Sequence, residues 1–256
     1  MITIITSLRS FENERQRLIQ RNALWSWTQL DPRPEIIVFG NDHKGTAEAC
    51  LEFGLKHISD IPTTPHGTPL ANKVFEIASN LAENELIAWV SSDIIVFQSF
   101  LKTVTALQNK GPLIGTLRRY DTNFSYSLEN DPEWEKRVLN EKMNFGALGA
   151  GDLFVFTRNF LKDMPPFAIG RAVVDTWMLW RGLSQKCCVD LGPSMKIIHQ
   201  YHDTGNKMEY WNENDLKEFQ ENRRLWFESE ACNFGNRITI NFANYVVAKG
   251  QLKPYN

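Results

Sequence analysis

Four short apolar runs, rich in β-branched residues, alternate with longer amphipathic segments near the start of the chain. The runs occupy residues 1–6, 35–39, 55–58 and 86–90. Runs of this length and composition are typical of strands buried on both faces, and the segments between them carry apolar residues at helical spacing. Strands and helices that alternate in this way predict an α/β fold, with a Rossmann-type, mostly parallel central sheet and helices on both of its faces.

Two of the predicted helices have clear boundaries in the sequence. The helix over residues 46–53 ends at Gly54, because glycine favours the left-handed conformation that closes many helices. In the next helix, Thr68 is the predicted N-cap and Pro69 is the first helical residue. Apolar residues recur after Pro69 at every third or fourth position, which predicts that one face of this helix packs on the sheet.

The alternation weakens after residue 116. We expect a helix opened by residues 131–133, a strand at 153–157, a helix at 175–181, short strands near Val189 and Ile197, and a charged amphipathic helix at 212–227. The tail at 237–248 fits strand and helix patterns equally well. We find no repeat or flexible linker, so we predict one domain over residues 1–205, with halves 1–117 and 118–205. A small C-terminal helical extension over residues 206–256 packs on the same domain.

The charge and the apolar segments exclude several classes of protein. Lys and Arg number 28 against 30 Asp and Glu, and a net charge of −2 offers no field that would attract DNA or an anionic membrane. We therefore expect no nucleic-acid partner. No apolar segment approaches the roughly 18 residues of a membrane-spanning helix, and no basic segment precedes the first run. The expectation is a cytoplasmic protein without a transmembrane segment. The four cysteines contain no C-x-x-C pair, which favours free thiols.

Polar residues directly follow the predicted strands. In an open parallel sheet, ligands bind beyond the carboxyl ends of the strands, so these residues are the candidates for a site. They are Thr6, Ser7 and Arg9 after the first strand, Asp42 after the second, Ser92 and Asp93 after the fourth, and His199 and His202 after the strand near Ile197. Carboxylate and imidazole groups are ligands for Mg²⁺ or Mn²⁺, and such an ion would neutralise a diphosphate.

Several catalytic motifs are absent from the sequence. There is no G-x-x-x-x-G-K-S/T phosphate loop, and the turn at residues 7–10 lacks the glycines of a dinucleotide-binding loop. This finding disfavours P-loop kinases and Rossmann dehydrogenases. The sequence also has no G-x-S-x-G nucleophile elbow and no H-E-x-x-H zinc helix.

The order of the remaining motifs resembles nucleotide-sugar-dependent glycosyltransferases of the GT-A fold, in particular the inverting, family-two-like enzymes. The resemblance rests on a first strand that ends in Thr6-Ser7, a second that ends in Asn41-Asp42, Gly67-x-Pro69 before a helix, the segment LIAWVSSDII at 86–95, and the later blocks at 149–157 and 165–177. It covers residues 1–202. The resemblance implies that the half at 1–117 binds the nucleotide-sugar and that the half at 118–205 binds the acceptor.

The resemblance also implies roles for individual residues. The donor nucleotide would contact Thr6, Ser7, Arg9, Asp42, Ser92 and Asp93. The family's D-x-D metal motif falls on residues 91–93, where only Asp93 is acidic, so His199 or His202 would complete the coordination of Mn²⁺ or Mg²⁺.

In the acceptor half, Asp175 resembles the catalytic base of inverting enzymes, and Asp152 and Trp177 would contact the acceptor. A carboxylate within hydrogen-bond reach of the acceptor hydroxyl is the group that such a reaction needs. The expected activity is transfer of a sugar, of the hexosyl or deoxyhexosyl class, from a UDP- or GDP-linked donor to the hydroxyl of a glycan or another acceptor.

Other interpretations stay open at this point. Asp175 also fits a helix N-cap, Asp42 fits ordinary turn chemistry, and the two histidines fit structural roles. A sugar nucleotidyltransferase is an alternative function, although its glycine-rich loop after the first strand is missing here. A non-catalytic nucleotide- or carbohydrate-binding scaffold is another. The incomplete acidic motif favours the scaffold, and the presence of both Asp152 and Asp175 disfavours it.

Overall fold

The computed structural model describes residues 1–40, 44–147, 151–202 and 211–255. Within these residues the larger sheet has nine strands, in the order β13-β12-β10-β6-β9-β4-β1-β2-β3. The strands are β1 (Ile2–Thr6), β2 (Glu35–Phe39), β3 (Lys56–Ile58), β4 (Leu86–Val90), β6 (Ile114–Thr116), β9 (Leu153–Thr157), β10 (Cys188–Asp190), β12 (Tyr245–Ala248) and β13 (Gln251–Pro254).

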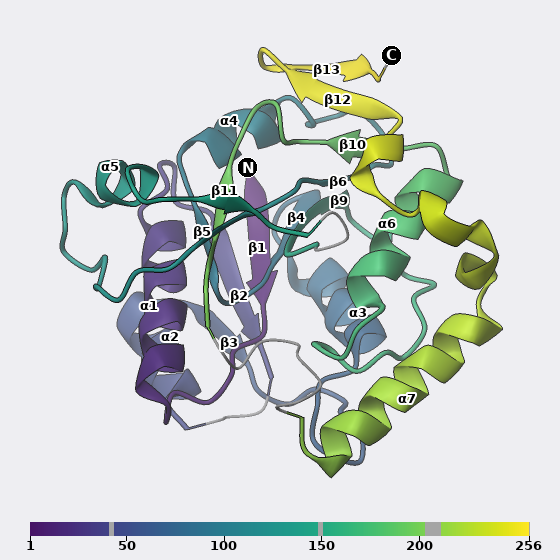
Figure 1. The fold of residues 1–256 in the computed structure, drawn as a ribbon, viewed down its shortest axis with the longest axis horizontal. Helices are drawn as coiled ribbons and strands as arrows, with labels where there is room; N and C mark the ends of the chain where they lie inside the picture. The colour runs from purple at the N-terminus through teal and green to yellow at the C-terminus, as the bar shows by residue number, and fades with distance from the viewer. Residues whose placement is uncertain (41–43, 148–150, 203–210, 256) are drawn as a thin grey trace.

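Parallel pairing dominates this sheet. Strand β1 lies between β2 and β4 and is parallel to both, and β2 is parallel to β3. The carboxyl ends of these four strands therefore meet at one edge. Strand β9 is the exception in the centre, because it runs antiparallel to both β4 and β6. Figure 1 shows the central strands between two layers of helices, and the predicted α/β fold with a mostly parallel sheet is confirmed.

The two helical layers pack on opposite faces of the sheet. Helices α1 (Glu14–Thr28), α2 (Thr46–Phe53) and α4 (Ser99–Thr105) cover one face, and α3 (Ala71–Leu81) and α6 (Val174–Ser184) cover the other. Alternate residues of each strand contribute to each layer, so Ile4 lies in the first apolar cluster and Ile5 in the second. Helix α7 (Glu213–Glu228) lies outside α3 and α6 at the lower right of Figure 1.

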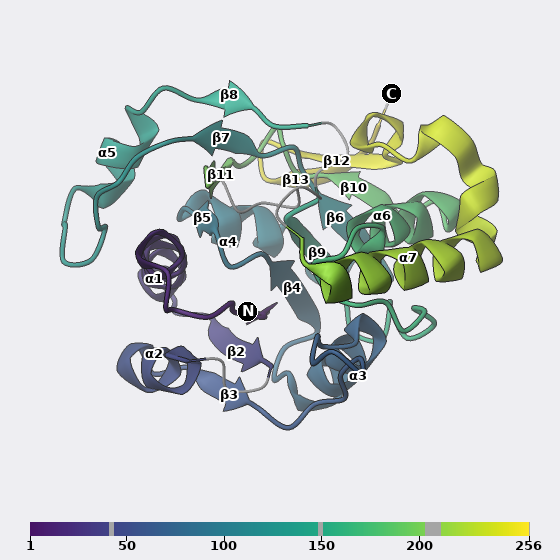
Figure 2. The ribbon, with the colours of Figure 1, turned by 60° about the horizontal axis from the view of Figure 1, so that its bottom comes forward.

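A second, smaller sheet was not predicted. It consists of β5 (Ile94–Val96), β11 (Ile197–Gln200), β7 (Tyr120–Thr122) and β8 (Asn144–Phe145), in the order β5-β11-β7-β8. Figure 2 shows β7 and β8 at its outer side, near the short helix α5 (Trp134–Leu139). Because β5 begins immediately after Asp93, this sheet is attached directly to the carboxyl end of β4.

Most of the predicted elements are confirmed, and one boundary is wrong. Helix α2 ends at Gly54, which has φ +62° as expected for a left-handed C-cap. Helix α3 begins at Ala71, two residues later than predicted. Thr68 does not cap this helix, because its hydroxyl donates to Glu218 of α7 at 2.8 Å.

The C-terminal extension contains more than the predicted helices. It includes α7 and two 3-10 helices, η2 (Glu230–Arg237) and η3 (Ile240–Phe242). The ambiguous tail then forms β12, which pairs in parallel with β10 and in antiparallel with β13. The extension therefore adds a hairpin to the central sheet. Among the described residues, none of the helices has the length and apolar character that crossing a bilayer requires.

Replacing Gly182 by Ala is expected to destabilise the fold, although alanine is the better helix former. A Cβ at Gly182 would lie 2.3 Å from Cγ2 of Ile114 and 3.2 Å from Cβ of Cys188, so α6 would have to move away from the sheet. Overpacking of this kind costs about 1–3 kcal/mol. Urea denaturation measures the difference, and an unchanged or higher free energy of unfolding would contradict this close packing.

Candidate active site

The candidate site is built at the carboxyl end of β4. Asp93 lies between the end of β4 and the start of β5, and the main-chain N–H of Ser91 donates to the carbonyl oxygen of Asp152 at 2.8 Å. Strand β11 pairs with β5 so that His199 lies opposite Ile94. The two sheets therefore bring Asp93 and His199 together from positions more than a hundred residues apart.

Asp93, His199 and His202 form a cluster of potential metal ligands. Oδ2 of Asp93 is 3.0 Å from Nε2 of His202 and 3.4 Å from Nε2 of His199, and one ligand atom from each residue lies within 4.8 Å of the others. Oδ1 of Asp93 is buried and has no hydrogen-bond partner among the described residues. A buried carboxylate oxygen without a partner is costly unless an ion or ligand contacts it.

Two residues that the sequence analysis missed lie beside the cluster and hold His199. Oδ1 of Asp121 in β7 is 2.9 Å from Nδ1 of His199, and Nε of Arg119 donates to the same carboxylate oxygen at 2.9 Å. Nη1 of Arg119 is 2.5 Å from Oδ2 of Asp152. A carboxylate on the second nitrogen of a histidine fixes the orientation of the ring, as is common around protein metal sites. Asp121 holds His199 in this way.

The electrostatics keep Asp93 ionised. Burial raises the pKa of Asp93, but the hydrogen bonds and charges of His199 and His202 outweigh that effect, so the pKa lies below its ordinary value. Burial lowers the pKa of His199, whereas its contact with Asp93 raises it, with a net upward shift. At neutral pH the cluster therefore offers an anionic oxygen at its centre.

Asp175 occupies the first turn of α6 and faces Gly151, two residues before β9. Its Oδ1 accepts from the main-chain N–H of Thr176 at 2.9 Å, and its Oδ2 accepts from the N–H of Gly151 at 3.4 Å. A Cβ at Gly151 would lie 3.2 Å from Cβ of Asp175 and 2.5 Å from the ring of Phe154. Only glycine allows this close approach.

Burial raises the pKa of Asp175 to about 6, and the neighbouring charge of Asp152 acts in the same direction, while hydrogen bonds from backbone N–H groups partly oppose the shift. Burial also raises the pKa of Asp152 above its ordinary value, despite the opposing charge of Arg119. A carboxylate with a pKa near 6 is ionised at neutral pH and is a stronger base than an ordinary aspartate, which suits general base catalysis.

The backbone before Asp175 is strained. Ala172 and Val173 both adopt the left-handed conformation, with φ of +56° and +61°. This conformation is a genuine outlier for the β-branched Val173. Such strain is concentrated at functional sites in proteins, where the surrounding structure maintains it.

The predicted donor residues have different surroundings. Oγ of Ser7 would be 3.3 Å from a Cβ placed on Gly40, so Ser7 lies beside the carboxyl end of β2. Thr6 is fully buried and its hydroxyl has no partner among the described residues. Ser92 is buried as well. Arg9 has an exposed side chain and a main chain held by Gln20 through hydrogen bonds of 2.7 and 3.0 Å.

Two further predicted residues need separate comment. Asp42 lies outside the described residues. Trp177 is only 3% exposed and packs against Trp180 in the apolar cluster between α6 and the sheet. Its ring is part of the core, and the contact between Trp177 and an acceptor stays a prediction.

The ligand atoms of the cluster suit a divalent transition-metal ion. One carboxylate and two imidazoles suit Mn²⁺ better than Mg²⁺, because Mg²⁺ prefers oxygen ligands throughout. Three protein ligands also leave coordination positions for the oxygens of a diphosphate. The observation that favours a bound ion here is the buried Oδ1 of Asp93, for which the described part of the chain supplies no hydrogen-bond partner.

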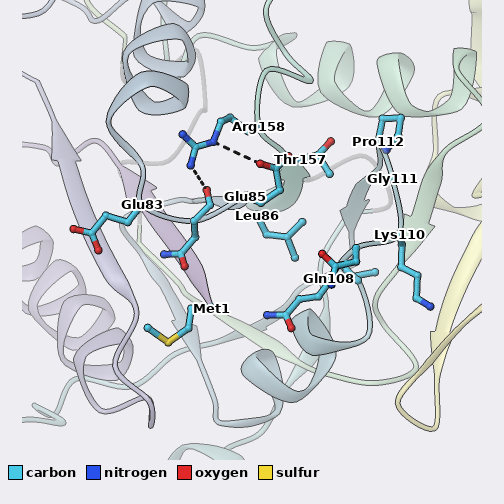
Figure 3. Close-up of a pocket in the computed structure, with 13 residues that line it drawn as sticks. Met1, Glu83, Glu85, Leu86, Gln108, Lys110, Gly111, Pro112, Thr157 and Arg158 are labelled. Carbon is cyan, nitrogen blue, oxygen red and sulfur yellow. Dashed lines mark hydrogen bonds and ion pairs between the residues drawn. The ribbon is translucent and has the colours of Figure 1, made fainter.

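A cavity of about 620 Å³ lies at the other end of the central strands. Met1, Leu86 at the start of β4, and Thr157 and Arg158 at the end of the antiparallel β9 contribute to its walls (Figure 3). Nη2 of Arg158 is bonded to the main chain there, because it donates to the carbonyl oxygens of Ala82 and Asn84. The cavity contains none of the predicted site residues and is separate from the cluster around Asp93.

No protein-family model and no curated protein sequence matches the chain. Solved structures do match. The chain is similar to S. aureus TarS 1–349 in complex with UDP-GlcNAc, with a TM-score of 0.57, 15% sequence identity, and coverage of 88% of this chain and 64% of that chain. It is also similar to glucosyl-3-phosphoglycerate synthase from Mycobacterium tuberculosis, in complex with Mn²⁺, UDP and glucosyl-3-phosphoglycerate. The TM-score is 0.51 at 12% identity, over 91% of this chain and 80% of that one.

A third similar structure is the mannosyltransferase PcManGT from Pyrobaculum calidifontis in complex with GDP-Man and Mn²⁺. Its TM-score is 0.50 at 12% identity, over 80% of this chain and 58% of that one. The chain thus spans less than two thirds of the TarS fragment and of the mannosyltransferase. At such low identity the likeness concerns the fold, and any activity has to be argued from the residues of this chain. These structural similarities and the order of its strands show that the chain has the GT-A fold of nucleotide-sugar glycosyltransferases.

Proposed function

We propose that this protein transfers a sugar from a UDP- or GDP-sugar to a hydroxyl acceptor, with inversion at the anomeric carbon. The observation that carries the proposal is the position of two chemically different groups at one edge of a GT-A sheet. The Asp93, His199 and His202 cluster is suited to a metal ion, and Asp175 is suited to act as a base. Asp152 is close enough to Asp175 for its charge to raise the pKa of Asp175, and it forms an ion pair with Arg119, which also bonds to Asp121 beside His199.

Asp175 is the proposed general base. Its carboxylate takes the proton of the acceptor hydroxyl while the acceptor oxygen attacks the anomeric carbon. The bond between that carbon and the diphosphate oxygen breaks, and the nucleoside diphosphate leaves with the electron pair. Burial of Asp175 strengthens it as a base, and the hydrogen bonds from Thr176 and Gly151 hold its orientation.

Asp93, His199 and His202 are the proposed ligands of Mn²⁺, with Mg²⁺ as the alternative ion. When bound, the ion supplies charge neutralisation for the diphosphate of the donor and of the leaving group. Asp121 keeps the ring of His199 in its position through the contact at Nδ1. This arrangement compensates for Ser91, which stands where a first acidic ligand is usual in the D-x-D motif.

The remaining donor contacts are proposed from the order of residues after the strands. We propose that Ser7, Arg9 and Ser92 contact the nucleotide, together with Asp42, which lies outside the described residues. Thr6, at the end of β1, directly precedes Ser7 and is proposed to support it. Asp152 is proposed to contact the acceptor. Similar solved structures carry UDP-GlcNAc, or GDP-Man with Mn²⁺, which supports nucleotide-sugars as the donor class. We propose residues 1–117 as the donor half and 118–205 as the acceptor half.

A donor panel tests the proposal. The purified protein with Mn²⁺ is expected to release UDP or GDP slowly from one nucleotide-sugar by hydrolysis, and EDTA is expected to lower that release by at least about tenfold. Nucleotide release is measured by a coupled assay. Release that is insensitive to EDTA would remove the metal from the proposal. No release, together with no nucleotide-dependent rise in melting temperature, would instead favour a scaffold that has lost donor binding.

A further inference from the structure

Helix α7 is amphipathic, and the two residues that it buries most deeply are polar. Glu218 is 4% exposed and Asn222 is 1% exposed. They are one helical turn apart and therefore lie on the same face. A buried carboxylate and a buried amide are costly unless each is fully hydrogen-bonded, so their partners indicate what this face does.

Asn222 binds the backbone of the segment that leads into α6. Its Oδ1 accepts from the N–H of Ala168 at 2.7 Å. Its Nδ2 donates to the carbonyl oxygens of Ala168 and Arg171, both at 2.9 Å, and to that of Ala172 at 3.2 Å. One side chain thus ties together three residues of the turn that ends in the strained Ala172 and Val173.

Glu218 binds the same turn and a second loop. Its Oε2 accepts from Nε of Arg171 at 3.0 Å and from the hydroxyl of Thr68 at 2.8 Å, and its Oε1 accepts from the hydroxyl of Thr64. Arg171 also forms an ion pair with Asp215, one turn earlier on α7. The loop before α3 and the turn before α6 are therefore held by a single carboxylate.

The strained turn sets the direction of the first turn of α6. The N–H of Val174 donates to the carbonyl oxygen of Ala172 at 2.9 Å, and the N–H of Trp177 donates to that of Val173 at 2.8 Å. Asp175 lies between these two bonds, so its orientation depends on the conformation of residues 172 and 173. A left-handed Val173 is unfavourable alone and persists only if neighbouring contacts hold it.

We propose that Asn222 and Glu218 of α7 are positioning residues, which hold the strained turn at 172–173 and so keep Asp175 in place against Gly151. This inference rests on the proposed function of Asp175 as the base. It gives the C-terminal extension a role in catalysis. Within the described part of the chain, α7 forms no hydrogen bond to a predicted site residue, so it acts through the turn.

Asn222→Ala tests the proposal, with Arg224→Gln as the matched control. Arg224 lies on the same helix, but it is exposed, and its ion pairs within the described residues are with Glu221 and Glu228 of α7. In Asn222→Ala, kcat for transfer is expected to fall by about 10- to 100-fold, because a small displacement of a catalytic group has effects of this size. The KM for the donor is expected to stay within about twofold of the original. Arg224→Gln is expected to change neither constant.

A second measurement does not depend on transfer activity. Carbon-13 NMR gives the titration midpoint of the Asp175 carboxyl, with Asp175→Asn used to assign its resonance. The midpoint is expected near 6 in the unaltered protein and lower in Asn222→Ala, because a displaced carboxyl is less buried. Glu218→Gln keeps the size of the side chain and removes its charge. It is expected to lower kcat and the titration midpoint as well, but by less than Asn222→Ala does. This variant replaces Asn222→Ala in the test if Asn222→Ala does not fold.

The outcomes separate the two proposals. If the unaltered protein transfers no sugar, the proposed function fails, while the NMR titration still tests whether α7 positions Asp175. An unchanged midpoint in both variants would overturn the positioning role. A fall in kcat matched by an equal loss of donor binding would also overturn it, since that result indicates general damage to the fold.

Discussion

The Asp175→Asn variant is expected to transfer sugar about 10²- to 10⁴-fold more slowly than the unaltered protein, because removal of a positioned general base has effects of this size. The amide has nearly the same shape as the carboxylate, but it has a single acceptor oxygen, whereas the N–H groups of Thr176 and Gly151 bond to different oxygens of Asp175. With the amide oxygen facing Thr176, only the longer bond from Gly151, at 3.4 Å, is lost. Nucleotide affinity is expected to stay within about threefold, since Asp175 contacts the acceptor side in the proposed mechanism. Steady-state kinetics and titration calorimetry with the nucleotide measure the two effects.

The pH dependence of the unaltered protein gives an independent check on the same residue. Only the ionised carboxylate of Asp175 can accept the proton, so kcat is expected to fall as the pH drops through about 6, the pKa that burial produces. An ordinary surface aspartate would lose activity only near pH 4. An acidic limb near 4 would therefore show that the base is another, more exposed carboxylate.

The stability of Asp175→Asn distinguishes loss of the base from loss of the fold. The pKa of Asp175 is raised from 3.8 to about 6 on folding, so its contribution to stability is present below pH 4 and is lost as the pH rises through 6. At pH 7 the neutral amide removes this cost but also loses one hydrogen bond, worth about 1 kcal/mol. At 1.36 kcal/mol per pKa unit, the variant is therefore expected to be more stable by about 1–3 kcal/mol. Urea denaturation at pH 4 and pH 7 measures the difference. If the variant were less stable at pH 7 and had lost nucleotide binding, its inactivity would result from damage to the fold and would not test the role of Asp175 as the base.

The central sheet could be predicted because its strands are buried on both faces. Residues 2–6 and 86–90 are entirely buried, and this requirement appears in the sequence as continuous runs of β-branched and apolar residues. The candidate residues that follow these strands could be found by the same reasoning, since the carboxyl edge of a parallel sheet is fixed by its topology. The reversal of β9 could not be predicted, because a buried antiparallel strand has the same composition as a parallel one.

The sequence analysis did not identify Asp121, Glu218 or Asn222, because their contacts depend on short elements or on pairings between distant parts of the chain. Asp121 lies in a strand of three residues, and so short a segment carries no usable periodicity. Its pairing with His199 spans 78 positions of the chain. Glu218 and Asn222 look like residues of a solvated helix face in the sequence, and their burial depends on the loops that pack on α7. The same contact explains why α3 begins later than its capping signal predicts.

In Asp93→Asn, Mn²⁺ affinity is expected to fall by at least about 100-fold, and metal-dependent donor hydrolysis is expected to fall with it. Asp93 supplies the only carboxylate of the cluster formed with His199 and His202 in the described residues. An amide oxygen is neutral and is a much weaker ligand for a divalent cation, whereas loss of an orienting group beyond the ligands costs only about 10- to 100-fold.

Titration calorimetry with Mn²⁺ measures the affinity, and Asp163→Asn is the matched control, because Asp163 is an exposed carboxylate paired with Arg181. In the unaltered protein, Mn²⁺ at 100 times its dissociation constant is expected to stabilise the native state by about 2.7 kcal/mol. That stabilisation is expected to disappear in Asp93→Asn and to remain in the control.

If Asp93→Asn bound Mn²⁺ as tightly as the unaltered protein, the ion would lie elsewhere. The unpartnered Oδ1 of Asp93 would then have to face the donor directly. Because a carboxylate beside a diphosphate is repulsive, that arrangement would require a sugar hydroxyl at this position, and removal of the charge would then weaken sugar recognition and leave the nucleotide affinity intact.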